Sequence, residues 1–307
     1  MEVLAIVLPV ILMMGIGKFL GISGLIDDHT VAGIKAIISN IMLPVTLFDA
    51  LAMTVFQGKD MLLVGACFLA FCAILGVAFL LRPLFGEYKT YAPFLCCGIE
   101  GGMLCYSLYM TIYGSESLGT LLRIDLANIL FAFTVFLFMI KSVGQGDVDM
   151  GQIARDYTKN PVVIGIVLGI IASLTGLGQA LAASSIYTVY APVKDMITAP
   201  LGALVLITVG YGLEFDKDIL AAVVKVSAVR LILNAAALSI IVVLFKSYWV
   251  EQALLVAITL EFFMPAQFIT PIYIDDEKQQ KFASTQLSFY SLIAIAAFVI
   301  INVAMPK

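Results

Sequence analysis

The feature that most constrains this chain is an apolar run, from about Trp249 to Ile274, that is long enough to cross a bilayer but cannot remain helical throughout. About 20 apolar residues suffice for such a crossing. Glu261, Pro265 and Pro271 lie inside the run. Because proline lacks a backbone N–H and clashes with the preceding turn, the run predicts a helix broken at membrane depth. Freed backbone groups are tolerated there only against protein or a water-filled cavity, so Glu261 is a candidate functional residue.

A second interrupted run occurs in the first half of the chain. Glu100 begins a Glu-x-x-Met pattern like the one that begins at Glu261, and Gly101 and Gly102 take the place of proline as the weak point of the helix. Interrupted helices at corresponding positions of two halves are typical of the binding sites of secondary transporters. The two runs therefore predict breaks near residues 100–107 and 261–267 that pass close to one another.

Composition places the chain in the membrane. Hydrophobic residues make up 62% of the sequence, charged residues 12%, and the mean hydropathy is +1.08. A soluble domain carries roughly 25% charged residues. We expect an all-α, multi-pass protein of the cell (plasma or inner) membrane, with the lipid bilayer as a partner and no nucleic acid partner. A second copy of the chain, in a homodimer, is a further candidate partner.

The apolar segments predict ten transmembrane helices. Their expected limits are about 3–20, 30–56, 61–81, 90–113, 118–141, 161–178, 190–213, 219–245, 249–273 and 282–304. The long polar connection 142–160 divides the chain into a first half, 1–141, and a second half, 161–307. Pro44 in helix 2 and Pro200 in helix 7 are expected to bend corresponding helices. Five helices in each half, an odd number, predict two repeats of inverted topology.

The distribution of Lys and Arg predicts the orientation. Eleven basic residues lie near the odd-numbered connections, namely Lys18, Lys35, Arg82, Lys89, Lys141, Arg155, Lys159, Lys217, Lys225, Lys278 and Lys281. Five lie near the other side, namely Lys59, Arg123, Lys194, Lys246 and Lys307. Because basic residues favour the cytoplasmic side, both termini are expected outside and the connection 142–160 inside.

The residues argue against an enzyme. The single histidine, His29, lies in a loop, and the five cysteines (67, 72, 96, 97 and 105) lie in apolar segments, so no metal-ligand set can be assembled. A membrane protease needs a histidine at membrane depth beside its serine or metal. No cofactor is expected, and H⁺ or Na⁺ is the candidate coupling ion. A channel stays an alternative, because broken helices also line pores.

Several short segments, in order along nearly the whole chain, resemble the auxin efflux carrier family, which includes bacterial malate-permease-like proteins and the plant PIN exporters. They are residues 43–48, 113–118, 160–161, 200–204, 229–231 and 264–267. The resemblance implies two inverted five-helix repeats with broken, crossing helices 4 and 9, the fold shared with bile-acid sodium symporters. It also implies carriage of organic anions by a scaffold rocking against a panel domain. The family's helix-4 amide is replaced here by Glu100 and its crossover proline is missing, which puts an anionic substrate in doubt.

The function predicted is a secondary active transporter that moves a small organic anion, such as a carboxylate or an auxin-like compound, by alternating access with protons or sodium. The alternative is a cation–proton antiporter with paired mid-membrane glutamates. The candidate substrate- or ion-binding residues are Glu100, Glu261, Gln267, Ser107, Thr270, Asn128 and Arg230. The candidate helix-break residues are Gly101, Gly102 and Pro265, and sodium is a candidate ligand of Glu100 and Glu261.

Structural alternatives apply to each of these residues. The two glutamates are also explained by a pair with Arg230 or by capping of a helix break, and Arg230 by a purely structural role. Hydroxyls in membrane helices often bond to the carbonyl four residues earlier. The intramembrane polar residues either line a cavity or join helices; they are Asn40, Asp125, Asn128, Asn234 and, nearer a helix end, Asp49. If Glu100 and Glu261 share one poorly solvated cavity, they should release protons in coupled steps.

Overall fold

The computed structural model describes residues 2–54, 56, 58–145, 158–213, 216–249 and 251–305, and across these ranges the regular structure is helical, with no strand. Among the described residues, six helices are long and apolar enough to cross a membrane: Asp28–Met53, Asp60–Leu80, Ser115–Val143, Tyr187–Tyr211, Leu220–Leu244 and Glu277–Ala304. Shorter apolar helices cover Leu8–Ser23, Pro161–Leu174 and Gln252–Phe262. The fold is therefore that of an all-α membrane protein.

The chain forms two compact units, and each contains segments from both halves of the sequence. Unit 1 comprises residues 1–60, 102–123 and 149–212, and unit 2 comprises residues 61–101, 124–148 and 213–307. The compact units thus do not coincide with the halves 1–141 and 161–307. The greater part of the predicted connection, residues 146–157, lies outside the described residues.

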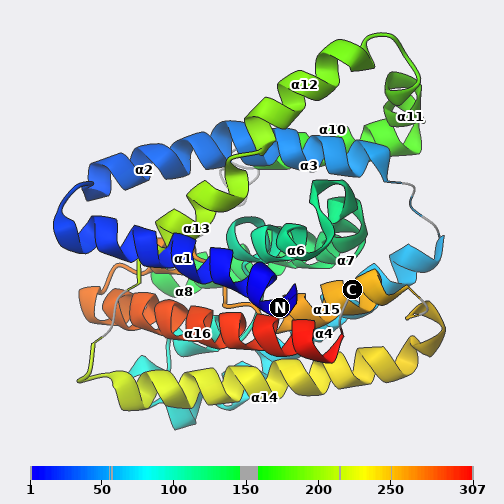
Figure 1. Cartoon of the computed structure of the whole chain (residues 1–307). Helices are drawn as coiled ribbons and strands as arrows, with labels where there is room; N and C mark the ends of the chain where they lie inside the picture. Colours follow the sequence, from blue (N-terminus) through cyan, green and yellow to red (C-terminus); the bar gives the residue numbers. More distant parts are fainter. Residues whose placement is uncertain are drawn as a thin grey trace. The chain divides into compact units, whose positions relative to one another are not determined.

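Unit 1 is built from helices of the N-terminal region and the middle of the chain. They are α1 (Glu2–Ser23), α2 (Asp28–Ile37), η1 (Ile38–Met42), α3 (Leu43–Met53), α6 (Tyr106–Tyr113), η4 (Ser115–Ser117), α10 (Pro161–Leu174), α11 (Leu177–Ala182), α12 (Tyr187–Thr198) and α13 (Leu201–Tyr211). Helix α3 lies beside α10, and α1 beside α13 (Figure 1).

Glycine allows these helix pairs to approach closely. A Cβ atom added at Gly17 of α1 would lie 2.0 Å from the carbonyl oxygen of Ile207, and one at Gly210 of α13 would lie 2.0 Å from that of Met14. On α10, a Cβ at Gly165 would lie 2.6 Å from the carbonyl oxygen of Pro44. Small residues at such contacts are the usual device for packing helices in a membrane, where lipid offers no hydrophobic drive.

The prolines predicted to bend helices 2 and 7 lie at irregular points of unit 1. Pro44 follows the π-helical turn η1, whose wider hydrogen-bond spacing accommodates the missing N–H. Pro200 separates α12 from α13. Helix 6 is shorter than predicted, because α10 ends at Leu174 and Gly176 adopts a left-handed φ of 74°.

Unit 2 contains the remaining helices. They are most of α4 (Gly58–Leu80), η2 (Arg82–Tyr88), α5 (Ala92–Leu95), the second part of α7 (Leu118–Phe131), η5 (Ala132–Phe136), α8 (Leu137–Gln145), α14 (Leu220–Leu244), η6 (Lys246–Tyr248), α15 (Gln252–Phe262), η7 (Thr270–Tyr273) and α16 (Glu277–Ala304). Helix α16 packs against α14 and α15, and both α14 and α16 contact α5. The helix α16 begins earlier than predicted because Asp276 caps it by accepting the N–H of Gln279.

Aromatic rings fill the core of unit 2. Phe71 of α4 stacks on Phe262 at a centroid distance of 5.2 Å and contacts Phe131 of α7 at 5.7 Å. Phe94 of α5 meets the edge of Phe136 at 5.7 Å. These five rings are fully buried. Two of them, Phe94 and Phe262, lie in the last turns of α5 and α15, after which the observed interruptions begin, so the rings give these segments a rigid support.

Candidate functional site

The first interruption lies between α5 and η3 (Gly101–Cys105). Residues 96–100 are non-helical, and Gly98 has a φ of 63°, which favours glycine. The break therefore begins at Cys96, earlier than the predicted Glu100. Gly101 and Gly102 open the next helical turn and are not the non-helical part, because it is the left-handed conformation at Gly98 that diverts the chain.

The second interruption follows α15. Helix α15 ends at Phe262, residues 263–269 are non-helical, and Pro265 lies among them. The main-chain N–H of Glu100 donates to the carbonyl oxygen of Pro265 at 2.9 Å, and Oε2 of Glu100 accepts from the N–H of Phe268 at 2.8 Å. Both predicted interruptions are present, and within unit 2 they contact each other.

The Glu-x-x-Met spacing does not mark equivalent positions. Glu100 is the last non-helical residue of the first interruption, whereas Glu261 is still within helix α15. Counted from the last helical residues, Leu95 and Phe262, the fifth residue is Glu100 in the first segment and Gln267 in the second. Relative to the ends of the preceding helices, Gln267 thus takes the position of Glu100, whereas Glu261 precedes the second interruption.

Arg230 of α14 joins the two interruptions. Its side chain is fully buried and donates five hydrogen bonds to main-chain carbonyl oxygens. Those of the first segment are Leu95 at 3.1 Å, Cys97 at 3.2 Å and Gly98 at 2.6 Å, and that of the second is Met264, at 3.2 and 2.7 Å. The guanidinium carbon lies 4.9 Å from the ring centroid of Tyr290. These bonds satisfy carbonyls that the breaks deprive of helical partners.

Two asparagines continue this pattern. Asn128 of α7 accepts a hydrogen bond from the N–H of Ile99 at 3.1 Å and donates one to the carbonyl oxygen of Ile99 at 3.2 Å. It also donates to a carboxylate oxygen of Asp125 at 3.0 Å. Asn234 of α14 donates to the carbonyl of Cys96 at 3.1 Å. Of the sequence-predicted ligand residues, Asn128 and Arg230 are therefore bonded to the main chain of the interruptions.

Glu261 differs from these residues. It is fully buried, and among the described residues neither of its carboxylate oxygens has a hydrogen-bond partner. Its electrostatic neighbours are the carboxylate of Asp125 and the thiol of Cys67. A buried carboxylate without a partner is costly unless it is protonated or binds a cation. The structure thus gives Glu261 an acidic neighbour, Asp125, that the sequence did not pair with it.

Gln267 and Thr270 are buried next to the second break. The hydroxyl of Thr270 donates to the carbonyl oxygen of Gln267 at 2.6 Å. The amide nitrogen Nε2 of Gln267 has no hydrogen-bond partner among the described residues. Of the predicted binding residues, this amide and the carboxylate of Glu261 are the groups that the structure leaves with unused hydrogen-bonding capacity.

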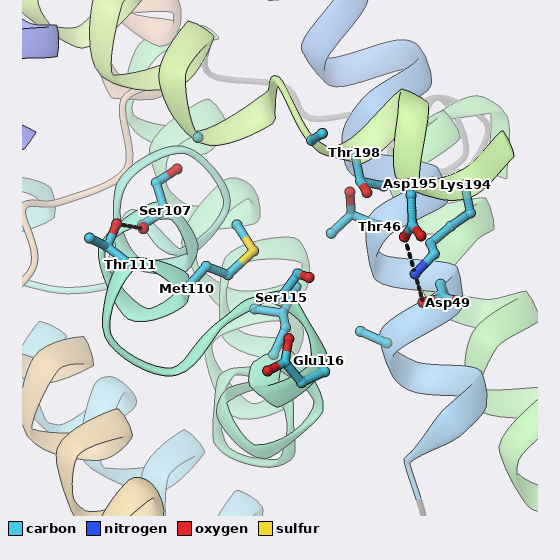
Figure 2. A pocket seen from close by; sticks show the side chains of 14 residues that line it. Thr46, Asp49, Ser107, Met110, Thr111, Ser115, Glu116, Lys194, Asp195 and Thr198 are labelled. Atoms are coloured by element: carbon cyan, nitrogen blue, oxygen red, sulfur yellow. Dashed lines mark hydrogen bonds and ion pairs between the residues drawn. The ribbon is translucent and has the colours of Figure 1, made fainter. Parts of the chain in front are cut away.

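Ser107 belongs to a different place, a polar cavity within unit 1 (Figure 2). The cavity has a volume of about 520 Å³. Its lining carries hydroxyl and charged side chains, among them Thr46, Asp49, Ser107, Thr111, Glu116, Lys194, Asp195 and Thr198. They come from α3, from the segment 107–118 and from the adjoining ends of α12 and α13.

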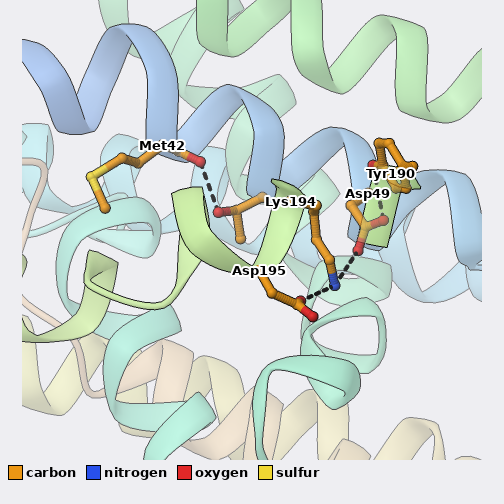
Figure 3. A network of polar contacts seen from close by, with 6 residues as sticks. Met42, Asp49, Tyr190, Lys194 and Asp195 are labelled. Atoms are coloured by element: carbon orange, nitrogen blue, oxygen red, sulfur yellow. Dashed lines mark hydrogen bonds and ion pairs between the residues drawn. The ribbon is translucent and has the colours of Figure 1, made fainter. Parts of the chain in front are cut away.

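A charged network borders this cavity (Figure 3). The ammonium of Lys194 lies 2.7 Å from a carboxylate oxygen of Asp195 and 3.5 Å from one of Asp49. Asp49 also accepts the hydroxyl of Tyr190 at 3.0 Å. The hydroxyl of Thr46 donates to the carbonyl of Met42, four residues earlier, as expected for hydroxyls in membrane helices.

Sequence reasoning missed Gly98 as the turning point and Lys194 as a charge within a membrane-spanning helix. A signal existed for Lys194, because an ionisable residue within an apolar helix is by default functional. Gly98 had no comparable signal, since the sequence does not show which glycine of several adopts a left-handed φ.

The fold and this site define an all-α membrane protein with two hydrogen-bonded helix interruptions. A scan against protein-family models and a search of curated proteins gave no match to this chain. The resemblance to the auxin efflux carriers therefore stays an expectation.

Proposed function

We propose that this protein is a secondary active transporter that moves a small organic anion across the cell membrane, coupled to protons or sodium. The observation that carries the proposal is Glu261, a buried carboxylate with no hydrogen-bond partner among the described residues, beside a broken helix segment that is hydrogen-bonded to a second one. Interrupted helices at membrane depth form the substrate and coupling-ion sites of many carriers.

The ten-helix arrangement in inverted repeats and a rocking motion of two parts belong to the same proposal. The six long apolar helices, the three shorter ones and the two interruptions support it. Interleaving of the halves in the compact units supports it too, because each inverted repeat then contributes helices to both parts of a carrier.

The class of substrate is the least constrained part of the proposal. The cavity of unit 1 has a volume typical of small-molecule sites. However, the ammonium of Lys194 is already paired with Asp49 and Asp195, so this lining does not select an anion by charge. The organic anion rests on the family resemblance. A thermal-shift screen of small carboxylates and amines, with and without sodium, tests it, because a ligand of the folded state raises the melting temperature.

The decisive experiment is transport by purified protein in liposomes with imposed pH or sodium gradients, using the ligand from this screen. We expect counterflow, in which unlabelled substrate inside accelerates uptake of labelled substrate. Glu261→Gln should leave the protein folded and active in counterflow but remove the response to the ion gradient, because the neutral amide no longer gains or loses a proton or cation.

Glu100→Gln is the matched control. The amide oxygen still accepts the N–H of Phe268, so coupling should weaken less than in Glu261→Gln. Wild-type gradient dependence in both variants would show that neither glutamate takes part in coupling. Uptake without any trans-stimulation would indicate a channel and overturn the carrier proposal.

The second candidate is a cation–proton antiporter, favoured by the proximity of two acids, Glu261 and Asp125. A fluorescent pH probe inside the liposomes separates the two functions. Alkalinisation on addition of sodium or potassium salts, with no organic substrate present, would favour the antiporter.

A further inference from the structure

Main-chain carbonyls in and next to both interruptions accept hydrogen bonds from the protein, among them the following eight. Arg230 donates to those of Leu95, Cys97, Gly98 and Met264, and Asn234 and Asn128 donate to those of Cys96 and Ile99. The carbonyl of Pro265 accepts the N–H of Glu100, and that of Gln267 accepts the hydroxyl of Thr270. These eight oxygens include that of Leu95, the last residue of α5, and that of Met264, the second residue after α15.

Such carbonyls are the groups to which a transported cation binds in carriers with interrupted helices. The C-terminal end of a helix also carries a partial negative charge that attracts a cation. Here a cation is present as a side chain, because the fully buried guanidinium of Arg230 donates to carbonyls just beyond the C-terminal ends of both helices. Arginine stays protonated in proteins, so this charge is permanent and cannot leave with the substrate.

We propose that Arg230 is a built-in cation at the carbonyl ends of the two interruptions, so that coupling in this protein uses protons and not sodium. This inference rests on the proposed function and names its coupling ion. A sodium ion would need to displace several of these donors, and would be repelled by the guanidinium that holds four of the carbonyls.

The proton then binds to the carboxylate of Glu261, whose oxygens have no hydrogen-bond partner among the described residues. The titratable groups that face it are Asp125 from α7 and Cys67 from α4. Those that face Arg230 are Tyr290 from α16 and Cys96 and Cys97 from the first interruption. The carboxylate of Glu100 is held by the N–H of Phe268 and is a weaker candidate.

The first test measures binding of sodium itself to the wild-type protein. We expect equal melting temperatures in sodium chloride and choline chloride across a concentration series, and no saturable binding of radioactive sodium. In liposomes, an inward pH gradient should drive uptake and an inward sodium gradient should not. Saturable sodium binding, or uptake driven by sodium, would overturn the inference.

The second test removes the built-in cation. Arg230→Ala should melt roughly 5 °C or more below the wild type, since several buried carbonyls lose their donors. Its melting temperature should rise with millimolar guanidinium or with sodium, but not with choline, because a small cation can now occupy the carbonyl site. Lys225→Ala is the control: this lysine lies on the same helix and donates to the carbonyl of Leu84, but it is exposed. It should show neither effect.

The readouts separate this inference from the proposed function. If no gradient drives uptake, the transporter proposal fails, while the sodium-binding and melting experiments still decide the role of Arg230. A variant Arg230→Ala that melts lower but responds to neither guanidinium nor sodium would show that the side chain only joins the segments, and the inference would be wrong. If this variant cannot be purified, the wild-type sodium binding decides.

Discussion

At Glu100 a carboxylate oxygen accepts the main-chain N–H of Phe268, whereas neither oxygen of Glu261 has a partner among the described residues. An ionised carboxylate bonded to backbone N–H groups at the start of a helical turn is in a favourable place. An ionised carboxylate that is buried in an apolar core without such donors is destabilised. Two residues of one chemical type therefore divide into a structural acceptor and a group that can exchange a proton.

Gly98 carries a prediction at this scale. Gly98→Ala should destabilise the protein by about 1–2 kcal/mol, because a residue with a Cβ is strained at its φ of 63°. The added Cβ would also lie 3.4 Å from Nε2 of Gln267 and from Phe131, so the neighbours would have to move slightly. Unfolding by a denaturing detergent, followed by tryptophan fluorescence, measures the change.

Gly65→Ala is the control for this prediction. Gly65 lies within helix α4, and a Cβ there would meet nothing within 4 Å. This substitution should leave the unfolding midpoint nearly unchanged. Equal midpoints for both variants would contradict a constrained turn at Gly98.

At the scale of elements, helices in unit 1 approach through glycine and helices in unit 2 are joined through Arg230 and asparagine. The difference arises because unit 1 contains continuous helices such as α1 and α13, whereas unit 2 contains the two interrupted segments. Continuous helices such as α1 and α13 satisfy their own backbone groups, so they need only close packing. The interrupted segments expose carbonyls and need donors from neighbouring helices.

Close packing predicts that Gly17→Ala destabilises the protein by about 1–3 kcal/mol, the usual cost of overpacking. A Cβ at Gly17 would lie 2.0 Å from the carbonyl oxygen of Ile207, a backbone atom that cannot move alone. The matched variant Gly15→Ala changes the same helix two residues earlier, where a Cβ would meet nothing within 4 Å. Thermal unfolding of both proteins measures the difference. A melting temperature of Gly17→Ala equal to that of Gly15→Ala would refute the predicted contact.

The start of α16 gives a prediction about pH. Lys278 and Lys281 form ion pairs with Glu87 and Asp216, each at 2.6 Å. Hydrogen bonds from these lysines hold the pKa of Glu87 below its ordinary 4.5 and the pKa of Asp216 below its ordinary 3.8. A lowered folded pKa stabilises the protein above the ordinary value, and this stability is lost as the pH falls through the folded value.

The double variant Lys278→Met, Lys281→Met should therefore unfold at a slightly lower temperature than the wild type at pH 7. The difference should begin to shrink as the pH falls below the ordinary values of the two carboxyls, and vanish only below their lowered folded values. It should be small throughout, because Glu87, Lys278 and Lys281 are exposed and solvent screens both pairs. Melting curves from pH 7 to pH 3 check the trend. A difference that grows toward low pH would contradict the lowered pKa values of the two carboxylates.

At the scale of the whole molecule, the features that could be predicted from the sequence are those that depend on residues close together in the chain. Apolar length predicted the long helices, and the prolines at 200 and 265 predicted the irregular points around them, since a proline acts on its own turn. The residue at which the first break starts, and the donors to its carbonyls, depend instead on tertiary structure. The start of the first break at Cys96 follows from the conformation of Gly98, and main-chain carbonyls that receive Arg230 leave no trace in the sequence.

The same limit explains why the sequence pattern did not show Asp125 as a neighbour of Glu261. The spacing of Glu100 and Glu261 to methionine contains no information about contacts between helices. Asn128 of α7 bonds to Ile99 in the first interruption, and Asp125 of the same helix interacts electrostatically with Glu261. Contacts between segments distant in sequence, such as α7 with residue 99 and α14 with residue 264, had to come from the fold.

The last prediction concerns the orientation of the whole chain. Ten spans with both termini outside put the connection around Thr90 in the cytoplasm and those around Ser185 and Ser247 outside, in keeping with the eleven-to-five distribution of basic residues. The three residues are exposed at the ends of helices, so each can carry a single cysteine in a background without the five native ones. An impermeant maleimide applied to intact cells should label cysteine substituted for Ser185 or Ser247, and should reach Thr90→Cys only after permeabilisation. The reverse pattern would show the opposite orientation with the same count of spans. Labelling of all three in intact cells, or opposite results for Ser185 and Ser247, would show that the count of spans is wrong, and with it the inverted repeats that rest on five helices in each half.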